Sequence, residues 1–418
     1  MSMNADAKQQ YQASLNRVLD AIKLKEPDRV PLIPVVEAFP YYYAGLTIQE
    51  GMYDYHKAGA ALDKFYADFH PDLGWDPVLM YPGKIMELLD MKWFQWPGRG
   101  IEDPNSMYQY IEKEYMTEDE YDELLLDPTH FIQSKWIPRS FGALDGLKYL
   151  ALRDSIWFGF FNTFPVFGRK EVQDSLQTLL KFAEEMNKWY TFLGEYDKKM
   201  ENEFGVPLAY GAWGYAPFDW LGDTMRGTVP ILRDIRERPD KLLAAIERFT
   251  PIAVEASING AKASGRPFVW VWLHKGVDQL MSKEQFGKFY WPSLRQYIQE
   301  LVDAGLTPFI YVEGSYHKRL EFLREVPKGK VVYDFEDIDM FEAKKVLGDV
   351  ACIAGNVPNA LLSYGTPAEV EEYCKKLIDV CAPGGGFMMD TAAMVDDAKP
   401  ENMQAMFKVT REYGVYRR

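Results

Sequence analysis

Acidic and imidazole side chains stand where several short apolar runs of this sequence end. Glu313 closes the run PFIYVE, Asp390 closes GFMMD, and His274 follows FVWVWL. If these ends meet, ionised carboxylates held away from water repel one another, and their pKa values rise unless a cation lies among them. We therefore predict that His274, Glu313 and Asp390 hold a metal ion, and we name the same three residues as the candidate catalytic groups.

Zinc is the ion that this set of donors suggests. An imidazole and carboxylates that leave one coordination position open are typical of catalytic zinc sites. The ion would polarise an ether oxygen or hold a methyl acceptor. None of the five histidines belongs to a recognisable metal-binding motif with fixed spacing. The prediction therefore rests on placement alone, and its ordinary alternative is that His274 is a hydrogen-bonded loop residue.

Other polar and aromatic residues near the same strand ends are candidates for substrate binding. Aromatic side chains there could form a wall for a methoxylated ring, although core packing would also explain them. Asp334 and Glu336 have a simpler explanation, which is capping of a helix or pairing with Lys344. The candidate substrate-binding residues are Glu37, Asp76, Tyr311, Trp213, Tyr215 and Asn356.

The elements that must position these residues alternate between short apolar runs and amphipathic stretches. Near-continuous apolar runs are typical of parallel strands that are buried on both faces. Eight such runs predict an α/β protein with the (β/α)8 TIM-barrel fold, and an open doubly wound sheet is the alternative. The predicted strands are Leu32–Glu37, Pro77–Tyr81, Pro207–Ala212, Phe268–Leu273, Pro308–Glu313, Val331–Phe335, Ala351–Gly355 and Gly386–Asp390. Catalytic residues of such barrels lie at the carboxyl ends of the strands.

Helical patterns fill the intervals between the later strands. Lys241–Lys262 has apolar residues at helical spacing, and the predicted helices Ser282–Asp303 and Thr366–Val380 both open with a capping box. Residues 84–202 break the rhythm with Trp, Pro, Gly and an acidic run. We interpret them as a long insertion after the second strand, near the barrel mouth, within a single domain that spans residues 1–418. A purely structural cap is the alternative.

Composition narrows the range of partners. The formal net charge of −15, without any Lys/Arg-rich run, disfavours binding to nucleic acid or to an anionic membrane surface. No apolar run approaches the ~20 residues of a membrane helix, and residues 1–19 lack the apolar core of a signal peptide. Three cysteines do not make a disulfide framework. We expect a cytoplasmic protein, and a second copy of the chain is a candidate partner.

The motifs of the C-terminal half carry a resemblance to a known family. GNVPNALLSYGTPAEVEEY, PFIYVEGSYHKRLEFL and GGGFMMDTAAMVDDAKPENM resemble the uroporphyrinogen decarboxylase superfamily, as do PDRVPLIPVV and YGAWGYAPFDWLGD nearer the N-terminus. This superfamily includes methylcobamide:coenzyme M methyltransferases and the methyltransferase components of O-demethylases. The resemblance implies the TIM-barrel fold, and it covers most of the chain except the insertion.

Two departures from the family pattern bear on the reaction. The decarboxylases bind substrate carboxylates with an Arg-rich loop, but here the matching stretch is Val35–Phe39 and contains Glu37 and no Arg. The methyltransferases hold zinc with His-x-Cys and a distant Cys, where this chain has Tyr311–Glu313 and Ala392–Ala393. The namesake reaction is thus disfavoured, and any zinc site must lack thiolates, as the resemblance implies for the O-demethylase methyltransferases.

The resulting hypothesis is a corrinoid-dependent methyltransferase. It would move a methyl group between a small molecule, with a methoxylated aromatic ether as the leading donor, and a cobalamin. Since the chain has no Asp-x-His-x-x-Gly motif, the cobalamin should be carried on a separate corrinoid protein. One alternative is a decarboxylase of a different carboxylated substrate, which would use Arg139, Arg169 or Arg226 as the cation. The other is a binding protein that has lost its chemistry.

Overall fold

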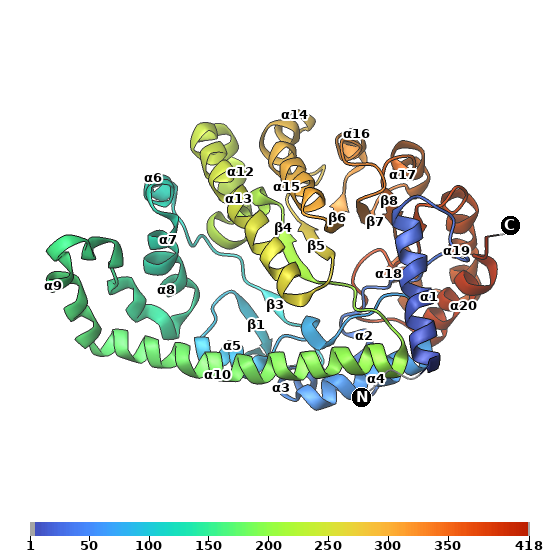
Figure 1. Ribbon diagram of the computed structural model, residues 1–418, viewed down its shortest axis with the longest axis horizontal. Coiled ribbons are helices and arrows are strands. Elements are labelled where there is room, and N and C mark those ends of the chain that lie inside the picture. Colours follow the sequence, from blue (N-terminus) through green and yellow to red (C-terminus); the bar gives the residue numbers. More distant parts are fainter. Residues whose placement is uncertain (1–4, 417–418) are drawn as a thin grey trace.

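A parallel β-sheet that follows the order of the chain forms the centre of the molecule. In the computed structural model, which describes residues 5–416, six strands pair in the order β4-β5-β6-β7-β8-β9. They are β4 (Ala212–Tyr215), β5 (Phe268–Leu273), β6 (Thr307–Ser315), β7 (Val332–Asp337), β8 (Cys352–Ala354) and β9 (Phe387–Met388). At least one helix lies between each strand and the next (Figure 1). The α/β class and a TIM-barrel-like fold are confirmed.

Two extended segments connect the free edges of β9 and β4. Parallel bridges join Leu32 to Met389 and Gly74 to Leu208, and the backbone N–H of Asp72 donates to the carbonyl of Leu32 over 2.7 Å. With these two segments the six strands form a ring, as in a (β/α)8 barrel.

The predicted strands agree best with the observed strands where the apolar runs are longest. Phe268–Leu273 is β5 as predicted, and the four later strands lie where they were expected. The first, Leu32–Glu37, makes isolated bridges at Leu32 and Val36, and Pro34 between them has no N–H to donate to a ladder. The third predicted strand, Pro207–Ala212, lies too early in the sequence, because β4 begins at Ala212.

The second predicted strand, Pro77–Tyr81, is wrong. Pro77–Leu79 is a turn of 3-10 helix, because Pro77 suits the first helical position and the Asp76 carboxylate accepts a hydrogen bond from the N–H of Val78 at 3.0 Å. The barrel segment lies just before it, around Gly74. Asp76 therefore follows the second barrel segment, at its carboxyl end, and does not precede it.

The helices begin and end with the signals that the sequence carries. Both predicted capping boxes are present, at Ser282 with Gln285 and at Thr366 with Glu369. A wider helical turn over Phe286–Tyr290 interrupts the predicted helix Ser282–Asp303. The helices outside the insertion are α1 (Ala5–Ile22), α2 (Phe39–Tyr43), α3 (Ile48–Tyr53), α4 (Tyr55–Phe69), α11 (Pro217–Leu221), α12 (Thr228–Glu237), α13 (Pro239–Ser264), α14 (Lys283–Gln285), α15 (Trp291–Asp303), α16 (Leu320–Leu323), α17 (Met340–Leu347), α18 (Asn359–Tyr364), α19 (Pro367–Cys381) and α20 (Pro400–Tyr413).

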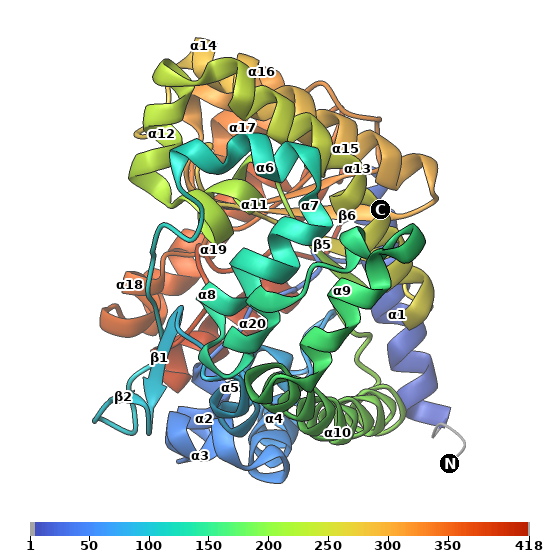
Figure 2. The same cartoon turned by 90° about the vertical axis from the view of Figure 1, so that its left-hand side faces the viewer.

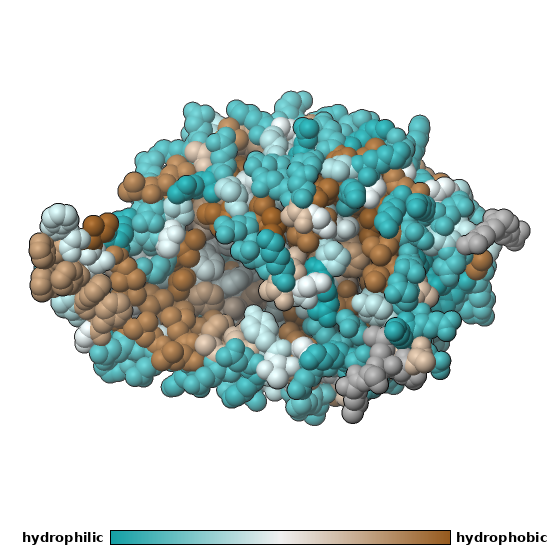
Figure 3. All heavy atoms as spheres, viewed as in Figure 1, coloured by the Kyte–Doolittle hydropathy of each residue, from teal (hydrophilic) through white to brown (hydrophobic). Residues whose placement is uncertain are grey.

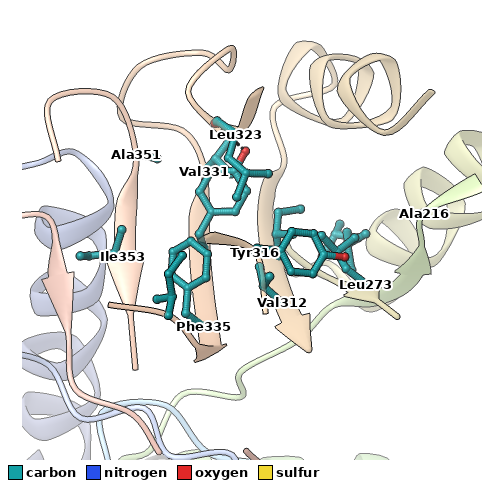
Figure 4. Close-up of a cluster of buried hydrophobic side chains, with 14 of the residues drawn as sticks. Ala216, Leu273, Val312, Tyr316, Leu323, Val331, Phe335, Ala351 and Ile353 are labelled. Carbon is teal, nitrogen blue, oxygen red and sulfur yellow. Dashed lines mark hydrogen bonds between the residues drawn. The ribbon is translucent and has the colours of Figure 1, made fainter. Parts of the chain in front are cut away.

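Side chains of the strands alternate between two cores. Trp272 and Tyr311 belong to the cluster inside the ring, whereas Leu273, Val312 and Phe335 belong to the outer cluster that packs against the helices (Figure 4). Residues of α1 pack into the inner cluster, and α1 contacts β9. None of the helices within residues 5–416 is long and apolar enough to span a membrane.

The segment between the second and third barrel segments lies over the sheet. Figure 2 shows helices α6–α9 in front of the strands. Its elements are α5 (Gly83–Leu89), β1 (Phe94–Pro97), β2 (Gly100–Ile101), β3 (Gln109–Tyr110), α6 (Tyr121–Leu126), α7 (Pro128–Phe131), α8 (Ile137–Ser140), α9 (Phe160–Thr163) and α10 (Lys170–Lys199). The hydroxyl of Tyr110 donates to the carbonyl of Asp223, which follows β4, so β3 reaches the carboxyl ends of the strands.

Candidate active site at the carboxyl ends of the strands

The imidazole of His274 lies between two carboxylates at the end of β5. Its Nδ1 is 2.6 Å from Oδ2 of Asp223, and its Nε2 is 3.6 Å from Oε1 of Glu313 in β6. Asp223 lies in the helical turn Gly222–Arg226 after α11. The side chains of His274 and Glu313 are 28% and 36% exposed, so both are partly accessible to solvent. The structure thus brings two of the three predicted catalytic residues together.

The charges around His274 keep it protonated. Burial alone would lower its pKa, but the hydrogen bonds and negative charges of Asp223 and Glu313 outweigh burial and raise the pKa well above the ordinary value. For Asp223, burial alone would raise the pKa. The hydrogen bond and charge of His274, with the charge of Lys275, outweigh burial and lower the pKa of Asp223 below its usual range. Imidazolium and carboxylate therefore form an ion pair at neutral pH.

A second carboxylate fixes the backbone that carries this pair. Asp219, which is fully buried, accepts hydrogen bonds from the N–H groups of His274 (2.8 Å) and Lys275 (3.0 Å) and from the hydroxyl of Tyr290 (2.5 Å). Burial and the charge of Asp223 raise the pKa of Asp219 to about 6. The Lys275 ammonium lies 2.8 Å from Asp223 and 3.4 Å from Glu112 of the insertion.

These partners were not predicted from the sequence. Asp219 and Asp223 stand four residues apart after β4. This helical spacing after a strand end was the signal in the sequence that could have identified them. Lys275 directly follows His274, whereas nothing in the sequence indicated Tyr110 and Glu112, because the insertion reaches the site only through the tertiary fold.

Glu37 lies at the mouth, as predicted, and is held by the insertion. The hydroxyl of Tyr108 donates a hydrogen bond to its carboxylate. Burial, with the charge of Asp396, raises the pKa of Glu37 to about 8. Glu37 is therefore mainly protonated at neutral pH, and it adds little negative charge to the site.

Asp390 lies apart from His274 and Glu313. Its carboxylate is fully buried and accepts the N–H groups of Val35 (3.1 Å) and Thr391 (2.5 Å), and it faces Asp334. Burial raises the pKa values of both acids, that of Asp390 to about 7, so the pair shares a proton. The hydroxyl of Tyr311 beside them has no hydrogen-bond partner among the described residues.

The predicted metal centre is consequently incomplete. Within residues 5–416, no three His, Cys, Asp or Glu side chains are grouped closely enough to hold a metal ion. His274, once its Nε2 proton is lost, and Glu313 would supply two donors that suit zinc, with Asp223 orienting the imidazole as an outer carboxylate does in zinc sites. The described residues thus fall one ligand short of the usual three.

Two of the predicted aromatic residues, Tyr215 and Trp213, are partly exposed at the strand ends. The Tyr215 ring lies 5.7 Å from the ring of His274 and is 39% exposed, while Trp213 stacks on Trp272 at 6.0 Å. Asp76 accepts the hydroxyl of Tyr210 at 3.0 Å and is buried. Tyr311 and Trp272 are almost completely buried, so core packing accounts for these two rings.

Asn356 stabilises its own turn. Its amide nitrogen donates to the carbonyls of Ile338 (3.0 Å) and Glu336 (3.3 Å), and its amide oxygen accepts the hydroxyl of Tyr373 at 3.2 Å. Both polar atoms of the Asn356 side chain therefore already have hydrogen-bond partners within the protein.

The arginines considered for a decarboxylase are paired elsewhere. Arg226 is buried and donates to Asp234 at 2.7 Å, and Arg139 donates to Glu120 at 2.7 Å. The guanidinium of Arg169 lies 3.8 Å from the centre of the Tyr149 ring. Each of these cations already has a partner outside the mouth.

Comparisons with known proteins identify a family by sequence and a shared fold by structure. Residues 175–413 match the sequence model of the family described as uroporphyrinogen decarboxylase (URO-D). The chain is similar in structure to a methyltransferase from Methanosarcina mazei, with 14% identity and a TM-score of 0.59, over 96% of this chain and 98% of that chain. This likeness shows a shared fold.

A B12-independent methionine synthase from Shewanella sp. W3-18-1, solved in complex with selenomethionine, is a more distant structure. It has 11% identity and a TM-score of 0.36, over 54% of this chain and 66% of that chain, which is too weak a likeness to carry an argument. No curated protein matches the sequence.

Proposed function

Because the chain belongs to the uroporphyrinogen decarboxylase (URO-D) family, we propose that it is an enzyme that transfers a methyl group between a small molecule and a corrinoid on a separate carrier protein. Family membership supports an activity of either the methyltransferase or the decarboxylase type. The observation that favours the former is the His274 imidazolium, held by Asp223 and facing Glu313, with the ring of Tyr215 beside it.

The chemistry of an ether donor suits this arrangement. When the methyl carbon bonds to the reduced cobalt of the corrinoid substrate, the C–O bond breaks and its electron pair remains on the oxygen. His274 would donate its Nε2 proton to that oxygen, since its pKa lies well above the ordinary value. A positioned general acid contributes roughly 10²–10⁴-fold to such a step. Glu313, which is partly exposed, would return a proton from solvent to the ring.

The rings of Tyr215 and Trp213 support a methoxylated aromatic ring as the donor. Tyr215 lies beside the imidazole and exposes part of its face, so a bound ring could stack there with its ether oxygen near Nε2. Asp223 and Asp219 act as positioning residues, because they hold the ring and the backbone of His274.

Zinc would be held by His274 and Glu313, and it would supply Lewis acidity to the ether oxygen when bound. The two donors fit this ion in type but not in number. The proton-donating role of His274 stands on its hydrogen bonds and does not depend on the ion.

The decarboxylase alternative needs a cation for the substrate carboxylate. The His274 imidazolium is paired with Asp223, and the neighbouring Lys275 ammonium is engaged by Asp223 and Glu112. A carboxylated substrate would also meet Glu313 at the opening. These charges favour a neutral or cationic substrate over an anion.

A direct test is the transfer of a methyl group to cobalamin reduced to the cobalt(I) state. The protein is incubated with 2-methoxyphenol, and with tetramethylammonium as a cationic donor, and the absorbance of methylcobalamin is followed. We expect methylation by the wild type, a loss of at least 100-fold with 2-methoxyphenol in His274→Asn, and full activity in His317→Asn, which changes an exposed histidine. Equal activity of H274N and wild type would remove His274 from the reaction. Release of CO₂ from carboxylated aromatic acids, without methyl transfer, would overturn the proposal in favour of a decarboxylase.

A further inference from the structure

Residues 151–168, which we call the aromatic arm, project from the insertion. The arm lies between α8 and the start of α10 and contains α9, at the end of the molecule opposite the C-terminus (Figure 1). None of residues 151–171 is buried. The arm packs mainly against itself and, through its last turn, against the start of α10. Val166 in that turn packs on a hydrophobic cluster of the insertion, and Arg153 lies 3.7 Å from Asp127. The arm therefore has no core of its own.

The exposed side chains of the arm are large and apolar. Trp157 is 84% exposed, and Phe158 and Phe161 are each 66% exposed. Figure 3 shows a brown, hydrophobic area at the left end of the molecule, where the arm lies. The others are Leu152, Ile156, Phe160, Phe164 and Phe167. At about 200 Å² per ring, the six aromatic rings leave roughly 700 Å² in contact with water. Monomeric proteins rarely expose so large an apolar patch.

The rings of the arm pack against one another. Phe160 and Phe161 lie 4.3 Å apart, and Phe158 stacks on Phe161 at 6.3 Å. Trp157 has a left-handed backbone with φ of 61°, which is uncommon for a bulky residue, and this turn presents its ring to solvent. Burial of these exposed rings against another surface would remove them from water and stabilise the arm.

We propose that the arm of a second copy of this chain covers it, in a symmetric dimer whose two aromatic arms pack together. The exposed ring area of one arm is close to the ~800 Å² that each partner buries in an interface of standard size. In a twofold dimer one patch meets itself, so an apolar patch supplies its own complement.

Charge favours the same occupant. The chain carries −15 overall, so two copies repel each other over most of their surfaces. The arm contains one arginine, Arg153, and one aspartate, Asp154, so its formal net charge is zero. It is therefore a region where two copies can meet with little repulsion. A second copy is also always present, whereas a carrier protein that docks only during turnover would leave the patch exposed to water.

The oligomeric state of the full-length protein tests the proposal without any measurement of activity. Sedimentation velocity at micromolar concentration should give a species of twice the chain mass of 48.3 kDa. The double variant Trp157→Asp, Phe161→Asp should raise the dimer dissociation constant by roughly 100-fold or more, since it places like charges opposite each other in the interface. Tyr364→Asp, at an isolated site on α18 that is 82% exposed, is the matched control and should remain a dimer.

A cross-link gives an independent readout if the double variant alters the arm itself. The three native cysteines are buried, so Phe161→Cys introduces one accessible thiol, and mild oxidation should yield a disulfide-linked dimer. A wild type that stays monomeric, or a dimer that persists in the double variant and is not cross-linked through position 161, would overturn the proposal. So would a monomer that binds phosphatidylcholine vesicles or a corrinoid protein through the arm.

Discussion

The Nδ1 atom of His274 lies 2.6 Å from a carboxylate oxygen of Asp223, although the two residues follow different strands of the barrel. The contact determines which nitrogen of the imidazole is available, because Nδ1 is occupied and Nε2 faces Glu313 and the opening. It also sets the charge of the ring, since a carboxylate at this distance stabilises the imidazolium.

Asp223→Asn should lower the pKa of His274. Burial lowers the pKa of His274, and the variant removes the negative charge of Asp223 that counteracts this effect. The imidazole would therefore become neutral at pH values where it is charged in the wild type. We expect methyl transfer to fall about 100-fold near pH 7.5 and to recover as the pH is lowered. NMR titration of the histidines, with His274→Asn to identify the signal, measures the shift. Glu247→Gln on the exposed face of α13 is the control, and an unchanged His274 titration in D223N would contradict this account.

Glu37→Gln should change how stability depends on pH. The pKa of Glu37 is about 8 in the folded chain and near 4.5 in the unfolded chain, so between these values the folded state binds more protons. The free energy of unfolding contributed by Glu37 therefore falls as pH rises, by at most ~1.4 kcal/mol per pH unit. E37Q lacks this titration and should gain stability relative to the wild type from pH 5 to pH 8. Urea unfolding at several pH values measures the free energy of unfolding of both proteins. If the two free energies changed with pH in parallel, the prediction would be refuted.

Arg226→Ala should destabilise the protein without a specific effect on substrate binding. Arg226 is buried beside Asp234, and its loss leaves that buried carboxylate with only the longer ion pair to Arg238, at 3.4 Å, and the hydroxyl of Tyr121, at a cost of about 3 kcal/mol. Arg169→Ala, which removes a partly exposed cation, should cost less than about 1 kcal/mol. Thermal and urea unfolding provide the comparison. A stable R226A protein with a raised KM would instead return Arg226 to the role of a substrate cation.

Zinc retention should distinguish the predicted ligands from one another. After incubation with zinc and desalting, the metal content measured by mass spectrometry should fall in His274→Asn and Glu313→Gln, because these residues face each other. Asp390→Asn should retain as much zinc as the wild type, since Asp390 pairs with Asp334 away from His274. An equal loss in D390N would place Asp390 among the ligands after all.

The sequence predicted the barrel better than it predicted the site. Continuous apolar runs located β5 to β9, because a strand that is buried on both faces leaves a local pattern. The second strand was misplaced because Pro77–Tyr81 is also apolar, and the cap from Asp76 that makes it helical was not recognised. His274 and Glu313 were found because they end strands. Asp223 was missed since its contact with His274 spans 51 residues, and such pairings leave no periodic signal.

The ring of strands also has a consequence for how the chain acquires its structure during synthesis. The first extended segment hydrogen-bonds through Ile33 to Met389 and through Val35 to Val395, residues that are made about 360 positions later. At ribosomal speeds of 5–20 residues per second, that edge waits roughly 20–70 s for its partner. Throughout this delay the nascent barrel has an unpaired flank, so protection from premature aggregation on the ribosome matters most for its earliest segment.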